Sequence, residues 1–345
     1  MKKPARRKTI PKKVSPVKLG IIALIILLSL IVLGKVINLF NASTKPFAPD
    51  CPVLSKLLTK NSTWNGKAPI NILVKSDQIY TLSFDPVQKL VTILKIPAQT
   101  YIDLPFEFGE WKVESIYDLG QSENPPMGAT LLKESLDNVL GVSLDGYLIL
   151  NQNLSKTAFP EIVVQLRQNP MAIWNLLYGS KTDLSLMEYL QFLFGVRGVR
   201  FDKVKEVDLE RSNISFWQIL ADGSRVLILD QIKLDQLIQQ NFEDSILKDE
   251  NLSIGIYNAT DHPGLAEKAS RIISNLGGRV AFTANYPQKM EKSVVSERSS
   301  YTGLRLSQLF APSQDKKTTL PKLDVSRAEV NLFLGEDYFL RYNTR

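Results

Sequence analysis

The chain has very little of the chemistry that cysteine and histidine provide. Its 345 residues include one cysteine, Cys51, and one histidine, His262. No disulfide can form within the chain, so we expect packed apolar cores to hold the fold. A zinc site and a Cys-His catalytic pair are excluded for the same reason. The sequence also lacks a Walker motif, a GxGxxG motif, a nucleophile elbow and internal repeats, so any catalysis would rest on carboxylates, lysine, arginine or hydroxyls.

Acidic residues are absent from the first 18 positions. The whole chain has 42 basic and 35 acidic residues, and eight of the basic residues lie in this tail. The remainder has 34 bases against 35 acids and is nearly neutral. A nucleic-acid-binding protein would need its bases on a folded face, so we expect no nucleic acid partner. The basic tail residues are Lys2, Lys3, Arg6, Arg7, Lys8, Lys12, Lys13 and Lys18.

A long apolar run follows the tail. Leu19 to Phe40 is 22 residues whose only charge is Lys35, long enough to cross a bilayer as a helix. The positive-inside rule predicts a cytoplasmic tail and a bulk, residues 41–345, outside the cell membrane. The alternative is a cleaved signal peptide, but its apolar core is shorter and Asn41-Ala42-Ser43 is a weak cleavage site. We therefore expect a retained single-pass anchor.

The residues beyond a stalk at 41–68 predict an α/β fold. Short apolar runs indicate strands, and apolar residues at helical spacing alternate with them, so we expect a mixed sheet with covering helices. The predicted strands cover 70–74, 78–84, 90–96 and 147–150, and the predicted helices lie in 113–117, 131–140, 154–166, 172–178 and 184–194.

Two further blocks follow. Residues 200–249 predict a β-hairpin and a helix without a chemical motif, either closing the first domain or forming a small one. Residues 250–345 predict a small α/β domain with a βαβ unit, in which Pro263 opens a helix that ends at Gly277. Its predicted elements are strands at 252–260, 279–283, 292–296 and 328–338, and helices at 263–276 and 302–310.

Several ordered blocks between residues 69 and 152 resemble the LytR-CpsA-Psr (LCP) family. Members are membrane-anchored proteins that transfer glycopolymers from a polyprenyl pyrophosphate carrier to the cell wall. The resemblance implies a bacterial envelope protein that meets a glycopolymer or a polyprenyl-phosphate lipid. The blocks are Asn71-Ile72-Leu73-Val74, Ser76-Asp77 through Asp85-Pro86, Val91 through Ile96-Pro97, Lys112-Val113-Glu114-Ser115-Ile116-Tyr117, and Leu140-Gly141-Val142 through Asn151.

The chain differs from the LCP family at positions where family members have charged residues. The loop with an acidic metal ligand and an arginine is missing, with Lys75 where that arginine would stand, and Ile-Pro-Arg-Asp-Thr becomes Ile-Pro-Ala98-Gln99-Thr. Phosphoglycosyl transfer needs several positive charges, often with a divalent ion, around the pyrophosphate oxygens. Asp77 alone is a poor Mg²⁺ ligand set. We therefore expect a pseudoenzyme that needs no cofactor.

Four residues of this region are candidate ligand-binding residues. Lys75, Asp77, Gln99 and Lys112 either line a surviving cleft for a phosphorylated or sugar ligand, or form strand-end salt bridges and solvated positions. If the chain were an active transferase, Lys75 and Asp77 would be its catalytic candidates and Mg²⁺ its cofactor. Trp111, Trp174 and Trp217 could stack on sugar rings, but each adjoins apolar residues, so we expect them to pack in or beside the core.

Residues 250–340 resemble the LytR C-terminal domain. The likeness lies in Asn258-Ala259-Thr260, in Gly264-Leu265-Ala266 and in the closing Leu334-Gly335-Glu336-Asp337-Tyr338. That domain has no established catalytic motif. Asn258 and Thr260 could bind an anion at a helix N-terminus, while the alternative is that Thr260 or Asp261 caps the helix.

These patterns predict a membrane-anchored cell-envelope protein that is a non-catalytic scaffold or glycopolymer-binding component of cell-wall assembly. The alternative is an active LCP-type phosphotransferase. A transcription regulator is disfavoured by the near-neutral charge beyond the tail. Envelope proteins are possible partners. The predicted organisation is a tail at 1–18, a transmembrane helix at 19–40, a stalk at 41–68, an LCP-like domain with a bridging hairpin at 69–249, and the LytR-type domain at 250–345.

Overall fold

The computed structural model describes residues 64–312, 314, 321 and 327–343, which fall within one compact unit. The predicted basic tail, the apolar run at 19–40 and most of the predicted stalk lie outside the described residues. Among the helices that are described, none combines the length and the apolar character needed to cross a membrane.

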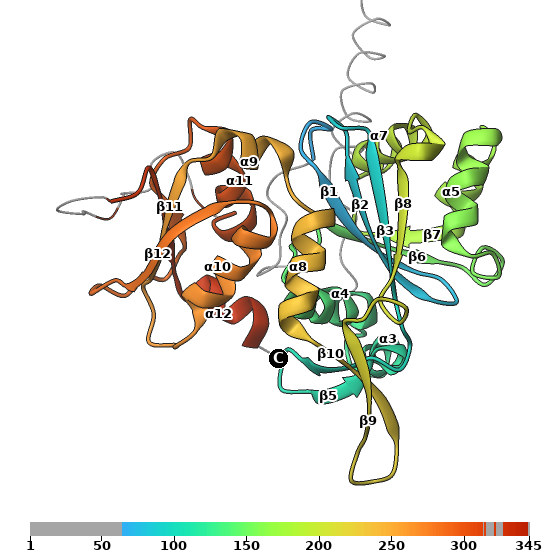
Figure 1. Ribbon diagram of the computed structural model, residues 1–345, viewed down its shortest axis with the longest axis horizontal. Coiled ribbons are helices and arrows are strands. Elements are labelled where there is room, and N and C mark those ends of the chain that lie inside the picture. Colours follow the sequence, from blue (N-terminus) through green and yellow to red (C-terminus); the bar gives the residue numbers. More distant parts are fainter. Residues whose placement is uncertain (1–63, 313, 315–320, 322–326, 344–345) are drawn as a thin grey trace, which may run out of the picture. The chain divides into compact units, whose positions relative to one another are not determined.

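The first sheet has six strands in the order β7-β6-β1-β2-β3-β8 (Figure 1). β2 is antiparallel to β1 and β3, while β6 runs parallel to β1 and β8 parallel to β3. The sheet is therefore mixed, as predicted. Its strands are β1 Ile70–Lys75, β2 Ile79–Asp85, β3 Leu90–Ile96, β6 Gly146–Leu150, β7 Ser180–Thr182 and β8 Val204–Asp208.

Helices cover both faces of this sheet because its strands alternate two sets of apolar residues. Ile70, Ile72 and Val74 face one core, with α5, α6 and α7, while Leu73 faces the other, with α3, α4 and α8. Figure 1 shows α5 and α7 apart from α3, α4 and α8. The helices are α3 Val113–Gln121, α4 Gly128–Leu140, α5 Phe159–Gln168, α6 Ala172–Gly179, α7 Leu186–Arg197 and α8 Gln231–Asn241.

Residues 200–249 pack into the first sheet. β8 is its edge strand, and Leu209, Leu234 and Phe242 belong to the same core as Leu73. A hairpin is present as a separate two-stranded sheet of β9 and β10, but residues 204–209, which we expected to supply one of its strands, instead supply β8 of the first sheet. A second hairpin, β4–β5, was not predicted from the sequence. The elements are β4 Tyr101–Leu104, β5 Gly109–Lys112, the 3₁₀ helix Phe201–Lys203, β9 Ser215–Ile219, β10 Arg225–Leu229 and α9 Ser245–Glu250.

The second sheet has four strands in the order β12-β11-β14-β13. β11 and β12 are parallel and are joined through α10, which confirms the predicted βαβ unit. A core that includes Ile254, Ile256 and Leu332 packs against α10 and α11. The elements are β11 Ser253–Asn258, α10 Leu265–Asn275, β12 Arg279–Asn285, β13 Val294–Val295, α11 Tyr301–Phe310, β14 Val330–Leu334 and α12 Glu336–Asn343.

Two sequence predictions were wrong in their boundaries. The helix expected at 154–166 begins only at Phe159, because Pro160 belongs to the first turn of a helix and residues 151–156 form turns. The terminal strand expected at 328–338 ends at Leu334, and a helix follows it. Glu336 and Asp337 occupy the first turn of that helix, where negative charge is favoured by the helix dipole.

Two arginines tie the helices of the second sheet to the first. Arg305 on α11 is 4% exposed and lies 3.6 Å from Asp145 and 3.5 Å from Asp244. Its Nη2 also donates to the Pro69 carbonyl, and Tyr301 donates to Asp244 at 2.6 Å. We call Arg305, Asp145 and Asp244 the buried junction.

Arg271 on α10 makes the second connection. Its guanidinium binds both carboxylate oxygens of Asp235 on α8 at 2.8–3.0 Å. It also donates to the carbonyls of Asn138 and Val139, at 2.8 and 2.6 Å, in the last turn of α4. A cation at a helix C-terminus satisfies unpaired carbonyls and complements the dipole, so α10 caps α4.

Candidate functional site

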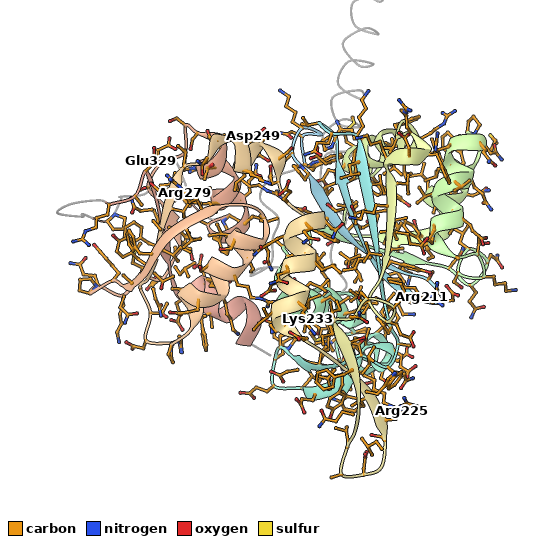
Figure 2. The ribbon with its side chains drawn as sticks, viewed as in Figure 1. Arg211, Arg225, Lys233, Asp249, Arg279 and Glu329 are labelled. Carbon is orange, nitrogen blue, oxygen red and sulfur yellow. The ribbon has the colours of Figure 1, made fainter. Side chains whose placement is uncertain are left out.

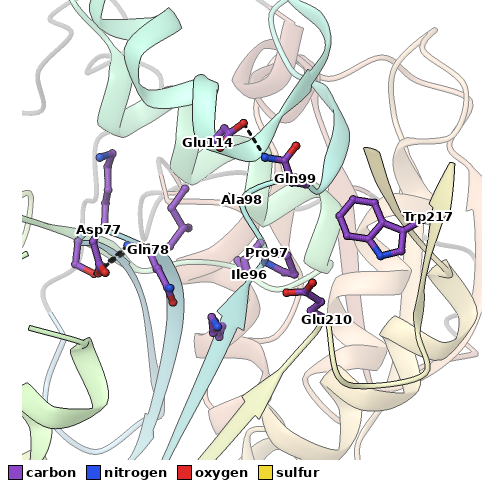
Figure 3. Close-up of a pocket in the computed structure, with 13 residues that line it drawn as sticks. Asp77, Gln78, Ile96, Pro97, Ala98, Gln99, Glu114, Glu210 and Trp217 are labelled. Atoms are coloured by element: carbon purple, nitrogen blue, oxygen red, sulfur yellow. Dashed lines mark hydrogen bonds between the residues drawn. The ribbon is translucent and has the colours of Figure 1, made fainter. Parts of the chain in front are cut away.

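A pocket of about 260 Å³ opens where β1, β3 and β8 end (Figure 3). These strand ends meet because β1 and β3 both run antiparallel to β2 and β8 runs parallel to β3, so all three strands end at the same edge of the sheet. Asp77 and Gln78 lie on one side, Glu210 and Trp217 on the other, and the loop after β3 lies between them. The lining residues are Lys75, Ser76, Asp77, Gln78, Ile79, Lys95, Ile96, Pro97, Ala98, Gln99, Glu114, Glu210 and Trp217.

The turn between β1 and β2 forms the first wall. Asp77 Oδ1 accepts from the Ser76 hydroxyl and from the Gln78 backbone N–H, both at 2.9 Å. These are the local bonds by which aspartate shapes a turn. Lys75 points its Nζ at the ring of Tyr117 on α3, 4.7 Å from the ring centroid. One lysine of this wall is thus engaged with an aromatic face.

The second wall comes from the loop after β3 and from the β9–β10 hairpin. Gln99 Nε2 donates to Glu114 Oε1 at 3.1 Å, which joins the loop to the start of α3. Trp217 on β9 is 42% exposed, and the guanidinium carbon of Arg225 on β10 lies 4.2 Å from the centre of its ring. Figure 2 shows Arg225 on this hairpin. The arginine fixes the indole, whose polar and apolar edges suit a sugar ring.

The pocket does not have an excess of positive charge. Its lining includes two lysines, Lys75 and Lys95, against the carboxylates of Asp77, Glu114 and Glu210. Lys95 is paired with Asp208 at 3.2 Å. Burial and then the charge of Asp77 raise the pKa of nearby Tyr80 to about 12, with Glu206 and Asp208 acting in the same direction. The carboxylates of the lining thus outnumber its lysines, which opposes binding of a pyrophosphate.

The structure brings together three of the four candidates from the first region. Lys75, Asp77 and Gln99 line the pocket, whereas Lys112 is not one of the lining residues and lies at the end of β5, just before α3. Glu210 was not a candidate, and Trp217 was considered for stacking on a sugar but was expected to pack in or beside the core. They follow Asp77 by more than a hundred residues, and only their place beside an expected hairpin could have pointed to them.

Of the two placements expected for the three tryptophans, in the core or beside it, the first was wrong. Trp111, Trp174 and Trp217 are 40%, 53% and 42% exposed. Trp111 and Trp217 lie on β5 and β9, hairpin strands with no buried residue, so apolar neighbours in sequence do not imply burial of the ring. Trp217 consequently becomes part of the pocket.

Asn258 and Thr260 lie at the end of β11, in the second sheet. Asn258 Oδ1 accepts from the backbone N–H and the hydroxyl of Thr260, at 3.1 and 2.8 Å, and its Nδ2 donates to the His262 carbonyl at 2.7 Å. These bonds close the loop. Capping of α10 by Thr260 or Asp261 is not observed, because the N-cap is Gly264, at φ 82°, with no side-chain cap. A left-handed φ suits glycine.

No group of three or more His, Cys, Asp or Glu side chains is arranged to hold a metal ion within the described part of the chain. The carboxylates of the pocket are separated by its hollow rather than gathered around one point, as Asp77 and Glu210 illustrate (Figure 3).

Comparison with solved structures finds LCP proteins of Bacillus subtilis. TagT, solved with LIIa-WTA, is 14% identical, with 51% of this chain and 90% of TagT covered and a TM-score of 0.37. TagV is 12% identical, with 51% and 97% covered and a TM-score of 0.40. The LCP protein YwtF (TagT), with octaprenyl pyrophosphate bound, is 14% identical, with 51% and 90% covered and a TM-score of 0.37.

Comparison with curated proteins finds no match. The family model of the LytR C-terminal domain, described as LytR cell envelope-related transcriptional attenuator, matches residues 251–338. The match covers β11 through the first residues of α12, the same segment in which the sequence resemblance was found. The chain therefore carries a LytR C-terminal domain, as predicted from its sequence.

Proposed function

We propose that the protein is a membrane-anchored component of the cell envelope that binds a glycopolymer without transferring it. The LytR C-terminal domain supports an envelope role, because its family is described as cell envelope-related. The apolar run at 19–40 supports a single-pass anchor with the bulk outside the membrane. Envelope glycopolymer, its polyprenyl-phosphate lipid and envelope proteins are the partners that this role implies.

The observation that carries the proposal is the charge of the pocket. A transferase must hold pyrophosphate oxygens while negative charge moves onto the leaving group, which requires cations in excess. Here three carboxylates face two lysines, and Lys95 is already paired with Asp208. Ala98 adds no polar group to the wall. The site thus lacks the electrostatic means of stabilising that transition state.

The same pocket has groups that recognise a sugar. Trp217 offers an exposed aromatic face beside the hollow. Gln99, Glu114 and Glu210 present donors and acceptors for hydroxyl groups. At about 260 Å³ the hollow is below the range of pockets for drug-sized ligands, so it suits one sugar unit of a longer polymer.

Two measurements with the full chain test this function. In the first, the protein is incubated with a polyprenyl-pyrophosphate oligosaccharide and an acceptor glycan in the presence of Mg²⁺, and we expect no turnover. Mg²⁺-dependent transfer that Asp77→Ala abolishes would establish the phosphotransferase instead. In the second, glycan binding is measured by isothermal titration calorimetry for the protein and its Trp217→Ala variant, because the heat of binding does not depend on the tryptophan that is removed. We expect binding that the variant loses, while Trp111→Ala, a tryptophan of equal exposure outside the pocket lining, retains it.

Topology is tested separately in whole cells. We expect externally added protease to digest residues 41–345 and to spare the tail. Full protection of the bulk would contradict the anchor orientation, and release of a form trimmed of its first forty residues would contradict the retained anchor.

A further inference from the structure

A row of exposed apolar side chains runs along helix α6. Met171, Trp174 and Tyr178 are 63%, 53% and 84% exposed. Their spacing of three and four residues places them on one side of the helix, while Ile173 and Leu176 face the core on the other side. The rings of Trp174 and Tyr178 stack with centroids 6.3 Å apart. We call Met171, Trp174 and Tyr178 the α6 row.

The surroundings of the α6 row contain no negative charge in sequence. From Ile162 to Thr182 there is no aspartate or glutamate, and the two charged residues are Arg167 and Lys181, one on each side of α6. Acidic residues would be repelled by anionic phospholipid headgroups, whereas flanking bases are attracted to them. Tryptophan and tyrosine are also the side chains that favour the boundary between water and lipid.

The chain that leads to the predicted anchor enters the fold beside α7. The backbone N–H of Trp64, the first described residue, donates to Glu188 on α7 at 2.6 Å. The next residue of α7, Tyr189, donates its hydroxyl to the Leu176 carbonyl on α6 at 3.3 Å. The helix that carries the α6 row is therefore bonded to the helix that receives the N-terminal segment.

The distance between anchor and fold permits contact with the membrane. Residues 41–63 join the apolar run to Trp64, and a fully extended chain of that length reaches at most ~80 Å. We propose that the α6 row docks on the surface of the anionic bilayer in which the chain is anchored. The aromatic side chains enter the headgroup layer, and Arg167 and Lys181 meet the phosphates. This inference rests on the proposed membrane anchor.

Such docking would orient the pocket. α6 lies on the face of the first sheet opposite to α3, whose residue Glu114 lines the pocket. A single membrane anchor does not by itself fix the orientation of the folded part. A second contact through α6 restricts that orientation, so the pocket is presented at a defined angle to glycopolymer at the membrane.

Tryptophan fluorescence of the full chain provides the test. The protein is reconstituted in vesicles of phosphatidylcholine and phosphatidylglycerol that contain lipid with a nitroxide near the headgroup, which quenches nearby indoles. We expect Trp174→Phe to lose most of the quenching. Trp111→Phe, which removes a tryptophan of similar exposure from a different element, should leave the quenching unchanged. Equal quenching in the wild type and Trp174→Phe would overturn the proposal.

A second variant changes the contact while keeping the reporter. Met171→Ser combined with Tyr178→Ser retains Trp174 and removes two of the three row side chains, so its quenching should fall. Phe216→Ser with Ile219→Ser, on the exposed hairpin, is the matched control and should quench as the wild type does. Resistance of the protein to alkaline extraction reports on the anchor independently. A protein that resists extraction but shows no quenching at Trp174 contradicts the docking alone.

Discussion

The buried junction and the pocket both contain charged side chains, but those of the junction are shielded from solvent and those of the pocket are exposed to it. In the buried junction, Arg305 and Asp244 are 4% and 0% exposed, and each lies within reach of opposite charge. In the pocket, Asp77, Glu114 and Glu210 are exposed. Coulomb energies are large where water is excluded and small where it is not. We therefore expect the first group to stabilise the fold and the second to determine which ligand binds.

The geometry of the two groups agrees with that division. Asp244 accepts from the backbone N–H groups of Ile246 and Leu247, at 3.2 Å, and from Tyr301. It thereby serves as the N-cap of α9 as well as a partner of Arg305. The pocket carboxylates of Glu114 and Glu210 are exposed to solvent. Variants in both groups test whether the buried charges stabilise the fold and the exposed charges do not.

The largest effect is expected for Arg305→Ala. Removal of the guanidinium leaves the buried carboxylates of Asp145 and Asp244 without their cation, and loss of one partner of a buried pair costs about 3–5 kcal/mol. Urea unfolding followed by circular dichroism measures the change. A loss below about 1 kcal/mol would mean that water reaches the junction, and the distinction between the two groups would fail.

The same variant should acquire a pH dependence. Burial raises the pKa of the Asp244 carboxyl, while the Arg305 charge and the Tyr301 hydroxyl act in the opposite direction. Without Arg305 the folded chain should bind a proton at a higher pH than the unfolded chain. A raised folded pKa gives stability that is present at low pH and lost as pH rises, so Arg305→Ala should regain stability between neutral pH and about pH 5. An unchanged deficit across that range would contradict this.

Arg271→Ala should have the next largest effect. It removes the two-oxygen contact with Asp235 and the cap on the last carbonyls of α4, and hydrogen bonds of charged groups contribute about 1.5–3 kcal/mol. Arg279→Ala is the matched control, because Arg279 is half-exposed and lies 3.6 Å from Glu329 (Figure 2). That exposed pair should contribute less than about 1 kcal/mol. Equal losses in the two variants would contradict the assigned cap.

The helices and strands that depend on short sequence patterns were predicted well. The short apolar run at 70–74 and the glycine at Gly277 that ends a helix each act over a few residues, so both can be recognised in the sequence. The helix α12 was missed because Glu336 and Asp337 follow a strand without a break other than Gly335. The prediction of this boundary failed because Gly335 is the only residue between the end of β14 and the start of α12.

Contacts across long sequence distances could not be predicted. Arg271 caps α4 from 132 residues away, and Arg305 bonds Pro69 from 236 residues away. Nothing in either arginine's neighbours indicates that it is partly or fully buried. The same holds for the pocket, where Lys75 and Asp77 were visible as candidates, but Trp217 is placed there because its partner Leu227 on β10 forms a bridge with Thr100 in the loop after β3. Topology, and not local pattern, assembles both charge groups.

A smaller effect is expected for Ser185→Ala at the start of α7. The Ser185 hydroxyl accepts from the Glu188 N–H while the Glu188 carboxylate accepts from the Ser185 N–H, at 3.3 and 2.9 Å, forming a capping box. Loss of such a cap costs about 1 kcal/mol. Ser122→Ala, at an exposed position, should change the free energy of unfolding by less than about 0.5 kcal/mol. The difference between the two measures what the capping box contributes, including the bond of 2.8 Å from the Ser185 hydroxyl to the Glu188 carboxylate.

The smallest effect on stability is expected in the pocket. Glu114→Gln with Glu210→Gln keeps the shape of both side chains and removes two exposed charges, so the free energy of unfolding should change by less than about 0.5 kcal/mol. The lining then holds Lys75 and Lys95 against Asp77 alone. We expect inorganic pyrophosphate to bind the variant several-fold more tightly than the wild type in calorimetry, and less so at high salt. A stable variant with unchanged pyrophosphate affinity would show that pocket charge does not select the ligand, whereas a loss above about 1 kcal/mol would place these carboxylates with the buried junction.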